Sequence, residues 1–212
     1  MRTVTDFLLD ILFPRLCLLC GKNGVLLCRE CTEELPSADA LSIPSAFALW
    51  RYSDTGVKKI LWHFKYRGGK LLAGIFALLL YQKITARHFL PADVNSENVI
   101  VTPIPITRMS RWRRGFNQSA LIAEKLSAFD SRFQFSPRAL TRTRRGKRQT
   151  AQKNRADRIR NMENAFAGDT SLTGRDVIVI DDIATTGATL REARRALLAA
   201  GARRVYAFVI AH

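Results

Sequence analysis

Residues 177–190 read VIVIDDIATTGATL, an apolar run that ends in two adjacent carboxylates and then in small hydroxylated residues. The apolar part predicts a strand that is covered on both faces of a parallel sheet. In such sheets, ligands bind beyond the carboxyl ends of the strands, where helix N termini present N–H groups and the positive end of a dipole. Asp181 and Asp182 are predicted to lie at such an end.

The segment after the acid pair has the composition of a phosphate-binding loop. It consists of Ala184, Thr185, Thr186, Gly187, Ala188 and Thr189. The glycine lets the backbone approach an anion, and the threonines offer hydroxyl donors. Because carboxylates repel a phosphate, the acid pair should face vicinal hydroxyls or a divalent cation, and a sugar phosphate satisfies both halves of the site. The simpler alternative, helix capping alone, needs one such residue rather than five.

Other phosphate-binding motifs are absent from the sequence. No G-x-x-x-x-G-K-[ST] occurs, and no G-x-G-x-x-G follows a strand. These absences argue against a P-loop nucleotide triphosphatase and a dinucleotide-binding fold.

The remaining chain alternates between apolar runs typical of buried strands and segments with helical periodicity. The further strands are expected in FALWRYS (47–53), NVIVTPIPI (98–106) and RRVYAFVIAH (203–212), and the helices in TGVKKILWHFKY (55–66), KLLAGIFALLLYQKITARHF (70–89), FNQSALIAEKLSAF (116–129) and ATLREARRALLAAGA (188–202). This order predicts an α/β fold with a mostly parallel sheet and flanking helices.

All four cysteines fall in one short segment, as two Cys-x-x-Cys pairs. They are Cys17, Cys20, Cys28 and Cys31. Four thiolates at this spacing are typical of a tetrahedral structural Zn²⁺ site, which replaces a hydrophobic core too small to fold alone. The alternatives are two disulfides, which a chain without a secretory signal disfavours, and redox-active dithiols, for which two pairs would be redundant.

The chain is expected to form two domains. Residues 1–45 would hold a short amphipathic helix and the zinc-binding module, residues 46–212 would form the larger α/β domain, and the cores of the two are expected to be separate. The run VTDFLLDILF (4–13) carries two aspartates and no cleavage site follows it. No apolar stretch reaches the about 20 residues that span a bilayer, so we expect a cytoplasmic protein without membrane insertion.

The charge of the chain favours a polyanionic partner. The formal net charge is +16, and residues 138–160 carry ten Lys or Arg and one acid. Within this run, the candidates for nucleic-acid contacts are Arg144, Arg145, Lys147 and Arg148. The alternative is a solvated surface loop.

VIVIDDIATTGAT resembles the signature of type I phosphoribosyltransferases. Further motifs narrow the resemblance to the ComF/GntX family, which is linked to competence and to the use of incoming DNA. They are the cysteine pairs, FKYRGGKLLA (64–73), TPIPITRMSRWRRGFNQSALIA (102–123), the basic run and NMENAF (161–166). The motifs cover nearly the whole chain in the family's order.

The resemblance implies a Mg²⁺-dependent site for 5-phosphoribosyl 1-diphosphate (PRPP). Asp181 and Asp182 would bind the ribose hydroxyls with Mg²⁺ nearby, residues 184–189 would hold the 5′-phosphate, and residues 138–160 stand where such enzymes have a flexible catalytic loop. The pyrophosphate side would carry Arg108, Arg111, Arg113 and Arg114. Arginines there would stabilise the charge that the departing diphosphate gathers. No segment recognisably selects an acceptor, so the acceptor and turnover itself are left open.

The second hypothesis is a non-enzymatic single-stranded DNA-binding protein with a vestigial or regulatory PRPP site. Charge in the basic run and stacking on aromatic side chains would suffice for binding without sequence readout. The aromatic candidates are Trp62, Phe64, Trp112 and Phe116. The acid pair distinguishes the two hypotheses, because carboxylates beside a phosphate contact bring nothing to a protein that binds only nucleic acid.

Overall fold

The computed structural model describes residues 15–67, 69–86, 99–143 and 164–212. The amphipathic helix expected in residues 4–13 lies outside these ranges. Within the described ranges, no helix is both long and apolar enough to cross a membrane.

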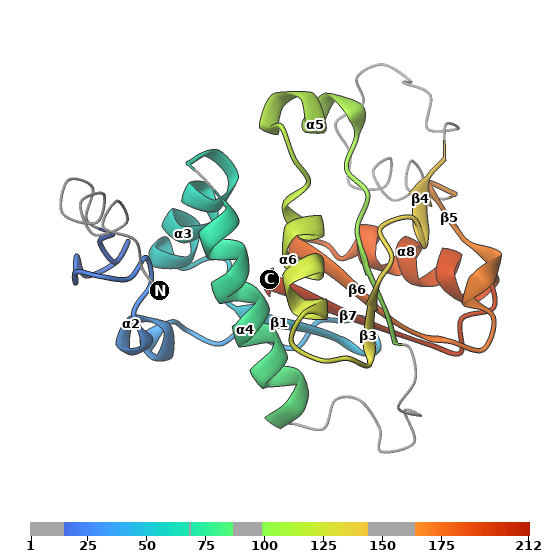
Figure 1. Cartoon of the computed structure of the whole chain (residues 1–212), viewed down its shortest axis with the longest axis horizontal. Helices are drawn as coiled ribbons and strands as arrows, with labels where there is room; N and C mark the ends of the chain where they lie inside the picture. Colours follow the sequence, from blue (N-terminus) through green and yellow to red (C-terminus); the bar gives the residue numbers. More distant parts are fainter. Residues whose placement is uncertain (1–14, 68, 87–98, 144–163) are drawn as a thin grey trace.

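A five-stranded parallel sheet forms the centre of the larger domain, with the strand order β1-β7-β6-β2-β3 (Figure 1). Its strands are β1 (Ala46–Trp50), β2 (Val99–Pro103), β3 (Phe133–Phe135), β6 (Asp176–Ile183) and β7 (Arg204–Ala211). The helices are α2 (Arg29–Glu34), α3 (Thr55–Tyr66), α4 (Lys70–Ala86), α5 (Arg108–Arg114), α6 (Gln118–Ser127) and α8 (Ala188–Ala199), with a 3-10 turn at η1 (Thr170–Leu172). The predicted α/β class and parallel sheet are confirmed.

The sheet is covered on both faces, as the continuous apolar strands predict. Along β6, Ile178 and Ile180 point into the hydrophobic cluster formed with α3, α4 and α6. Their neighbours Val177 and Val179 point into a second cluster that contains the apolar face of α8. Alternate residues of one strand therefore fill two cores, which explains why β6 shows no polar alternation.

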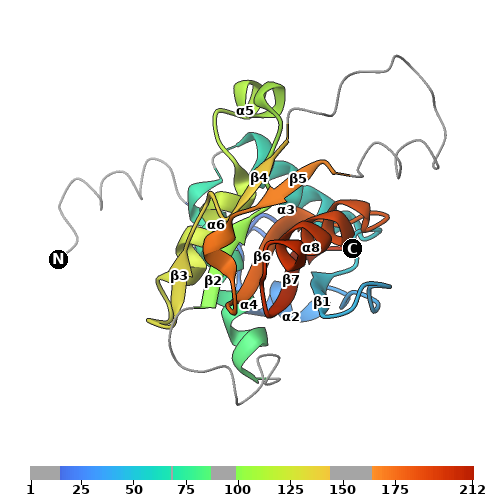
Figure 2. The same cartoon turned by 90° about the vertical axis from the view of Figure 1, so that its right-hand side faces the viewer.

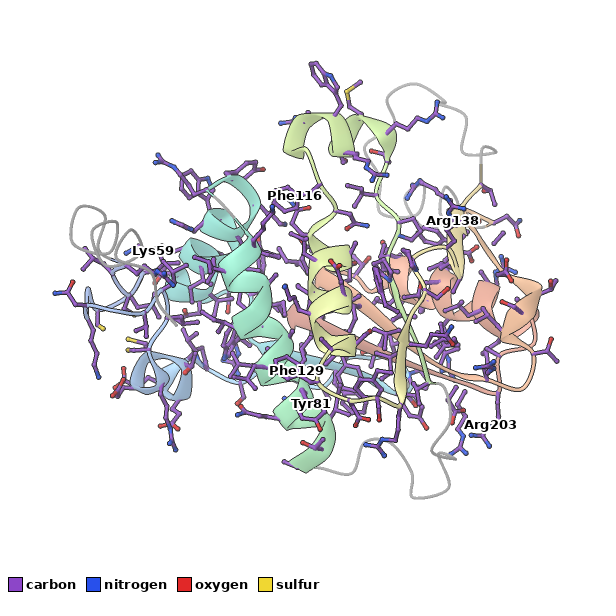
Figure 3. The ribbon with its side chains drawn as sticks, in the orientation of Figure 1. Lys59, Tyr81, Phe116, Phe129, Arg138 and Arg203 are labelled. Carbon is purple, nitrogen blue, oxygen red and sulfur yellow. The ribbon has the colours of Figure 1, made fainter. Side chains whose placement is uncertain are left out.

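Helices α4 and α6 lie side by side on one face, and their far ends are joined by aromatic contacts. The rings of Tyr81 in α4 and Phe129 after α6 are stacked at 5.5 Å (Figure 3). Deeper in this core, Phe76 packs edge-on against Phe64 at 5.0 Å and against Trp50 at 6.0 Å. These contacts hold α3 against α4 beside the sheet.

Two further elements lie outside the central sheet. The antiparallel pair β4 (Leu140–Arg142) and β5 (Phe166–Gly168) flanks residues 144–163 in sequence. Helix α5 stands above α6 in both views, on the connection from β2 to α6 (Figures 1 and 2). Its limits are set locally, because Thr107 caps its N terminus and Gly115 ends it in the left-handed conformation.

The cysteine module packs directly against the larger domain. Cys17, Leu27, Cys28 and Cys31 belong to the same hydrophobic cluster as the buried faces of α3 and α4. The expectation of separate cores is therefore wrong: the module is too small to bury its apolar side chains by itself, and it shares the surface of the neighbouring helices. The boundary near residue 45 stays a prediction about independent folding.

Candidate functional site

The acid pair lies where the sequence predicts it, at the carboxyl end of β6. Asp181 is paired in register with Val209 of β7, and the backbone N–H of Ile104 donates to the carbonyl of Ile180 at 2.9 Å. Asp181 and Asp182 are thus the last polar side chains of a strand that is held from both sides. Their position is fixed by the sheet rather than by a loop.

Asp181 ties β6 to the first turn of α6. The hydroxyl of Ser119 donates to Asp181 Oδ1 at 3.0 Å, and the backbone N–H of Asp182 donates to the same oxygen at 2.9 Å. Asn117, the N-cap of α6, accepts from the backbone N–H of Ser119 and donates to the carbonyl of Ile104. The beginning of α6 is thereby held against the carboxyl end of the sheet.

The surroundings of Asp181 disfavour its charge. Burial, followed by the adjacent Asp182 carboxylate, raises the pKa of Asp181 to about 8, although the hydrogen bonds from Asp182 and Ser119 and the nearby Lys65 act in the opposite direction. At neutral pH the pair therefore carries less than two full negative charges. A cation brought beside the pair would favour the ionised form of Asp181.

Asp182 is paired with a lysine from a different part of the chain. Lys65 Nζ, in the last turn of α3, lies 2.9 Å from Asp182 Oδ2, and the two side chains are only 18% and 15% exposed. This pairing gives the Asp182 carboxylate a cationic partner in a partly buried position. A ligand hydroxyl or cation that reaches Asp182 would share or replace the contact with Lys65.

The loop after β6 turns sharply into α8. Ala184 is buried, its N–H donates to the carbonyl of Ala211, and its own carbonyl lies 3.0 Å from Nδ1 of His212. Thr185 and Thr186 are exposed. Both ends of the loop are thus anchored to the sheet and the helix, while the two threonines face outward.

Gly187 is required at the turn for two reasons. Its φ of +71° is in the left-handed region, and an added Cβ would collide with the side chain of Ile43. It is the N-cap of α8, which has no side-chain cap, and Ala188 and Thr189 form the first turn of that helix. The uncapped N terminus of a 12-residue helix beside an acid pair matches the arrangement that a phosphorylated sugar needs.

The arginines predicted for the pyrophosphate side are not brought to the acid pair. Arg108, Arg111 and Arg113 lie exposed on α5. Among the described residues, none of these three forms an ion pair. Arg114 is the last residue of α5, and its side chain is not among those described. Their assignment to diphosphate stays a prediction.

The proposed nucleic-acid contacts lie outside the described residues. They are Arg144, Arg145, Lys147 and Arg148. Of the aromatic candidates for stacking, Trp112 is 83% exposed and Trp62 is 52% exposed. Phe64 is completely buried between α3 and α4, so it cannot stack on a base, and Phe116 is only partly exposed.

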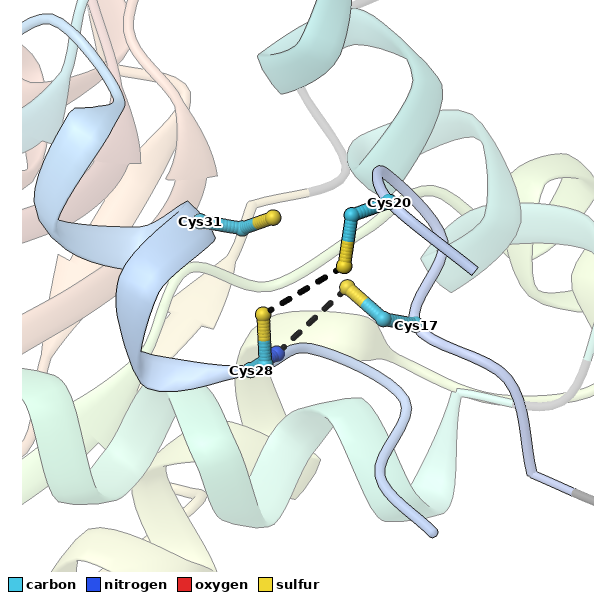
Figure 4. Close-up of side chains that lie close together, drawn as sticks. All are labelled: Cys17, Cys20, Cys28 and Cys31. Atoms are coloured by element: carbon cyan, nitrogen blue, oxygen red, sulfur yellow. Dashed lines mark hydrogen bonds between the residues drawn. The ribbon is translucent and has the colours of Figure 1, made fainter. Parts of the chain in front are cut away.

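The four cysteines converge as their spacing predicts (Figure 4). Their sulfur atoms all lie within 4.8 Å of one another, and the Cys20 and Cys28 sulfurs are 3.6 Å apart. The first pair sits on a knuckle in which the N–H of Gly21 donates to the carbonyl of Cys17 at 2.9 Å, and Gly21 has a φ of +78°. The second pair is set by α2, which begins directly after Cys28 and contains Cys31.

The pKa values of two of these thiols are shifted by their close packing. Although burial opposes it, backbone N–H donors lower the pKa of Cys17 to about 6. The neighbouring thiols, Cys28 first, together with burial, raise the pKa of Cys31 far above its usual range. Four thiolates this close together would repel one another, so they require a cation among them. The cluster could hold a metal ion, and its ligand set is the one that zinc prefers.

Two residues near the acid pair, Lys65 and Ser119, are absent from the sequence-based assignment. Both fall inside quoted motifs, FKYRGGKLLA and TPIPITRMSRWRRGFNQSALIA. A lysine late in a helix and a serine in a first helical turn are common without any function. Only their tertiary positions beside Asp182 and Asp181 mark them.

A family model of known proteins matches the part of the chain that contains the candidate site. Residues 121–212 match the family model of the phosphoribosyl transferase domain, a segment that contains the acid pair and the loop at 184–189. The fold and the site therefore define a protein with a type I phosphoribosyltransferase-like domain, as the sequence predicts.

Proteins similar to this chain over most of its length have names that refer to DNA utilization or competence. The chain is 29% identical over 194 residues to DNA utilization protein YhgH of Escherichia coli (strain K12), covering 90% of this chain and 81% of that protein. It is 28% identical over 189 residues to Competence protein ComFC of Bacillus subtilis (strain 168), covering 88% and 72%. Competence protein F of Haemophilus influenzae is 27% identical over 189 residues, covering 87% and 77%. The chain is therefore similar over most of its length to competence and DNA-utilisation proteins, and the resemblance to the ComF/GntX family is confirmed.

One solved structure is similar to this chain over part of its length. Glutamine phosphoribosylpyrophosphate (PRPP) amidotransferase from B. subtilis, complexed with ADP and GMP, matches 65% of this chain and 25% of that chain. The sequence identity is 19% and the TM-score is 0.40.

The cysteine cluster generates a first prediction. Protein purified without added metal should carry one zinc per chain by elemental analysis, and Cys20→Ser should lose it. Because the cluster shares a hydrophobic core with α3 and α4, we expect this variant to lower the unfolding temperature of the whole chain. Lys22→Ala, which removes only an exposed ion pair with Glu30, should keep both the zinc and the unfolding temperature. Parent protein without zinc would contradict the assignment.

The raised pKa of Asp181 predicts a pH dependence of stability. Between the unfolded value near 3.8 and the folded value near 8, the folded chain binds the proton and the unfolded chain does not, so stability falls as pH rises, by up to about 1.4 kcal/mol per pH unit. Asp181→Asn should remove this loss, and its gain over the parent should grow from pH 5 to pH 8 in denaturant unfolding without added magnesium.

A matched control for this variant is Asp169→Asn. The hydrogen bonds from Ser171 lower the pKa of Asp169, so its charged form stabilises the fold above its unfolded pKa and the substitution should destabilise. A gain from Asp181→Asn that is equal at pH 5 and pH 8 would show that Asp181 is ionised throughout.

Proposed function

We propose that the chain binds PRPP together with Mg²⁺ at the carboxyl end of β6. One observation carries this proposal: a rigid acid pair is followed within a few residues by a glycine turn at the uncapped N terminus of α8. The acids would accept from the ribose 2- and 3-hydroxyls, and the loop 184–189 would bind the 5′-phosphate through backbone N–H groups and threonine hydroxyls.

The residues present suit a magnesium-bound sugar phosphate. Asp182 Oδ2 is buried, and Lys65 lies beside it. Within the described part of the chain, no donor forms an aligned hydrogen bond to this oxygen. Bound Mg²⁺ would neutralise part of the charge on the diphosphate. Of this chain's own residues, Ser119 would keep Asp181 oriented, and Lys65 would balance the charge of Asp182 while the ribose is absent.

The basic elements of the chain fit the diphosphate end of this ligand. The arginines of α5 follow β2 in the sequence, and the basic run at 138–160 includes β4. Guanidinium groups would stabilise negative charge on a departing diphosphate. We propose in addition that the metal of the cysteine cluster is zinc with a structural role, and that the protein works in the cytoplasm, where four free thiols stay reduced.

A second candidate function is the binding of single-stranded DNA, which would connect the site to the use of incoming DNA. The observation that favours it is the surface of α5, where Trp112 is 83% exposed and Met109 is 59% exposed beside three exposed arginines. Large exposed aromatic side chains among cationic groups are typical of stacking platforms for single strands. In this form, PRPP would be a regulatory ligand.

Replacement of both acids tests the proposed ligand site. Asp181→Asn with Asp182→Asn keeps the size of both side chains but removes their charge, so the affinity for Mg-PRPP in calorimetry should fall about a hundredfold or more, since each hydrogen bond to a charged group contributes about 1.5–3 kcal/mol. The affinity for ribose 5-phosphate should fall less than the affinity for Mg-PRPP, because the double variant retains the phosphate loop.

Gly187→Val is the complementary variant. It places a side chain where Ile43 already lies and where the phosphate must approach, so it should weaken ribose 5-phosphate and PRPP alike. If the double asparagine variant binds Mg-PRPP as tightly as the parent does, the acids do not bind ribose and the proposed site is wrong.

The DNA hypothesis has its own test in the salt dependence of binding. Affinity for a single-stranded oligonucleotide should fall steeply with salt, and neutralisation of the candidate cations should flatten that slope. The variant carries glutamine at Arg144, Arg145, Lys147 and Arg148. Trp112→Ala should weaken binding without changing the slope. An affinity that changes neither with salt nor with these substitutions would contradict the DNA hypothesis.

A further inference from the structure

A cavity of about 770 Å³ lies next to the acid pair, on the side of α3. Its wall includes Ile183, the last residue of β6, and Tyr52, whose N–H donates to the carbonyl of His212 at the end of β7. The cavity therefore opens over the carboxyl ends of β1, β6 and β7.

The chemistry of this cavity is aromatic and cationic. The side chains that line it and carry the argument are Tyr52, Lys58, Lys59, Trp62, Lys65 and Tyr66. No aspartate or glutamate belongs to its described lining. A wall of this kind favours a flat aromatic molecule that carries a negative charge, because rings stack on Trp and Tyr while ammonium groups pair with an anion.

The three lysines are not equivalent. Lys58 donates to the carbonyl of Ser53 and lies 5.9 Å from the centre of the Tyr52 ring. Lys65 is committed to Asp182. Lys59 is exposed on α3 (Figure 3), and among the described residues no acceptor or carboxylate holds its ammonium group. Lys59 is thus the cation available to an incoming anion.

The aromatic residues form a pair at helical spacing. Trp62 and Tyr66 are four residues apart on α3, with ring centres 5.9 Å apart, and they are 52% and 56% exposed. Large aromatic side chains left this exposed beside a cavity are more typical of binding sites than of a monomer's surface.

We propose that this cavity binds the acceptor, and that the acceptor is a planar aromatic molecule with an acidic group such as a carboxylate. This rests on the proposed PRPP site and adds the substrate class that the sequence leaves open. Lys65 joins the two sites, because it lines the cavity and pairs with Asp182. The acceptor's nucleophilic atom would form a bond to ribose C1, and the C1–O bond would break with its electron pair leaving on the diphosphate. An N–H nucleophile would then lose its proton to water, whereas a ring nitrogen without a proton would keep the positive charge it gains.

The test uses matched pairs of aromatic acids and amides, which differ by one charge on the same ring. Nicotinate and nicotinamide supply one ring, and quinaldate and quinaldamide supply two fused rings. Binding is measured without PRPP by tryptophan fluorescence in a Trp112→Phe background, where Trp62 is the exposed tryptophan and Trp50 is buried. At least one acid should quench saturably and bind about tenfold or more tightly than its amide, as one ion pair in a partly enclosed site allows.

Variants locate the binding. Lys59→Gln should abolish most of the preference for the acid over the amide, whereas Lys125→Gln, an equally exposed lysine on α6 outside the cavity lining, should leave it unchanged. Trp62→Ala should weaken acid and amide together in ligand-observed NMR. The proposal is overturned if neither acid binds, if amides bind as tightly as acids, or if a single-stranded oligonucleotide occupies the cavity in preference to both acids.

Failure of this inference and failure of the proposed function give different results. Gly187→Val should lose PRPP yet keep the quenching of Trp62 by the acid, because the phosphate loop is not part of the cavity lining. A parent protein that binds Mg-PRPP but no aromatic acid contradicts only the acceptor site. A parent protein that binds the acid but no PRPP contradicts only the proposed function.

Discussion

The hydrogen bond from Ser119 to Asp181 joins the end of the central strand to the beginning of α6, and the rest of the site depends on it. β6 lies between β2 and β7 in a sheet that is covered on both faces, so its last residues have little freedom. A carboxylate held there loses much of its hydration, which explains its raised pKa. The packing of the two cores compensates for the free energy of burying this carboxylate. A ligand that brings hydroxyls or a cation would lower that free energy.

Charge is distributed unevenly around this point. A chain with a net charge of +16 places two adjacent acids, Asp181 and Asp182, at the carboxyl end of its central strand, and Lys65 of α3 lies 2.9 Å from Asp182. A net positive charge favours polyanionic partners, whereas in the proposed site the acid pair would bind the uncharged hydroxyls of a phosphorylated sugar. α3 then has two roles, since it packs through Phe64 into the core and presents Lys59, Trp62 and Lys65 at the carboxyl edge of the sheet.

The sequence predicts the elements whose periodicity is strong and misses features that only tertiary contacts create. The limits of α3 and the position of β6 follow from apolar spacing and from caps such as Asp54, which accepts from the N–H of Val57. The short strands β3, β4 and β5 and the helix α5 have three to seven residues, too few for a pattern. The acid pair and Gly187 are marked by local chemistry. Lys65 is not, because its partner Asp182 is more than a hundred residues away in the sequence. The same limit explains why the cysteine module was expected to have its own core.

The most direct test of the account is a calorimetric titration of PRPP into the unmodified chain, used as purified, with and without Mg²⁺. The proposed site predicts saturable binding of one PRPP per chain in the presence of Mg²⁺, and much weaker binding without it, because the diphosphate and the acid pair repel each other unless a cation lies between them. Absence of binding under both conditions, or equal affinity with and without Mg²⁺, would contradict the claim that Asp181, Asp182 and the loop at Gly187 form a site for a magnesium-bound phosphoribosyl ligand.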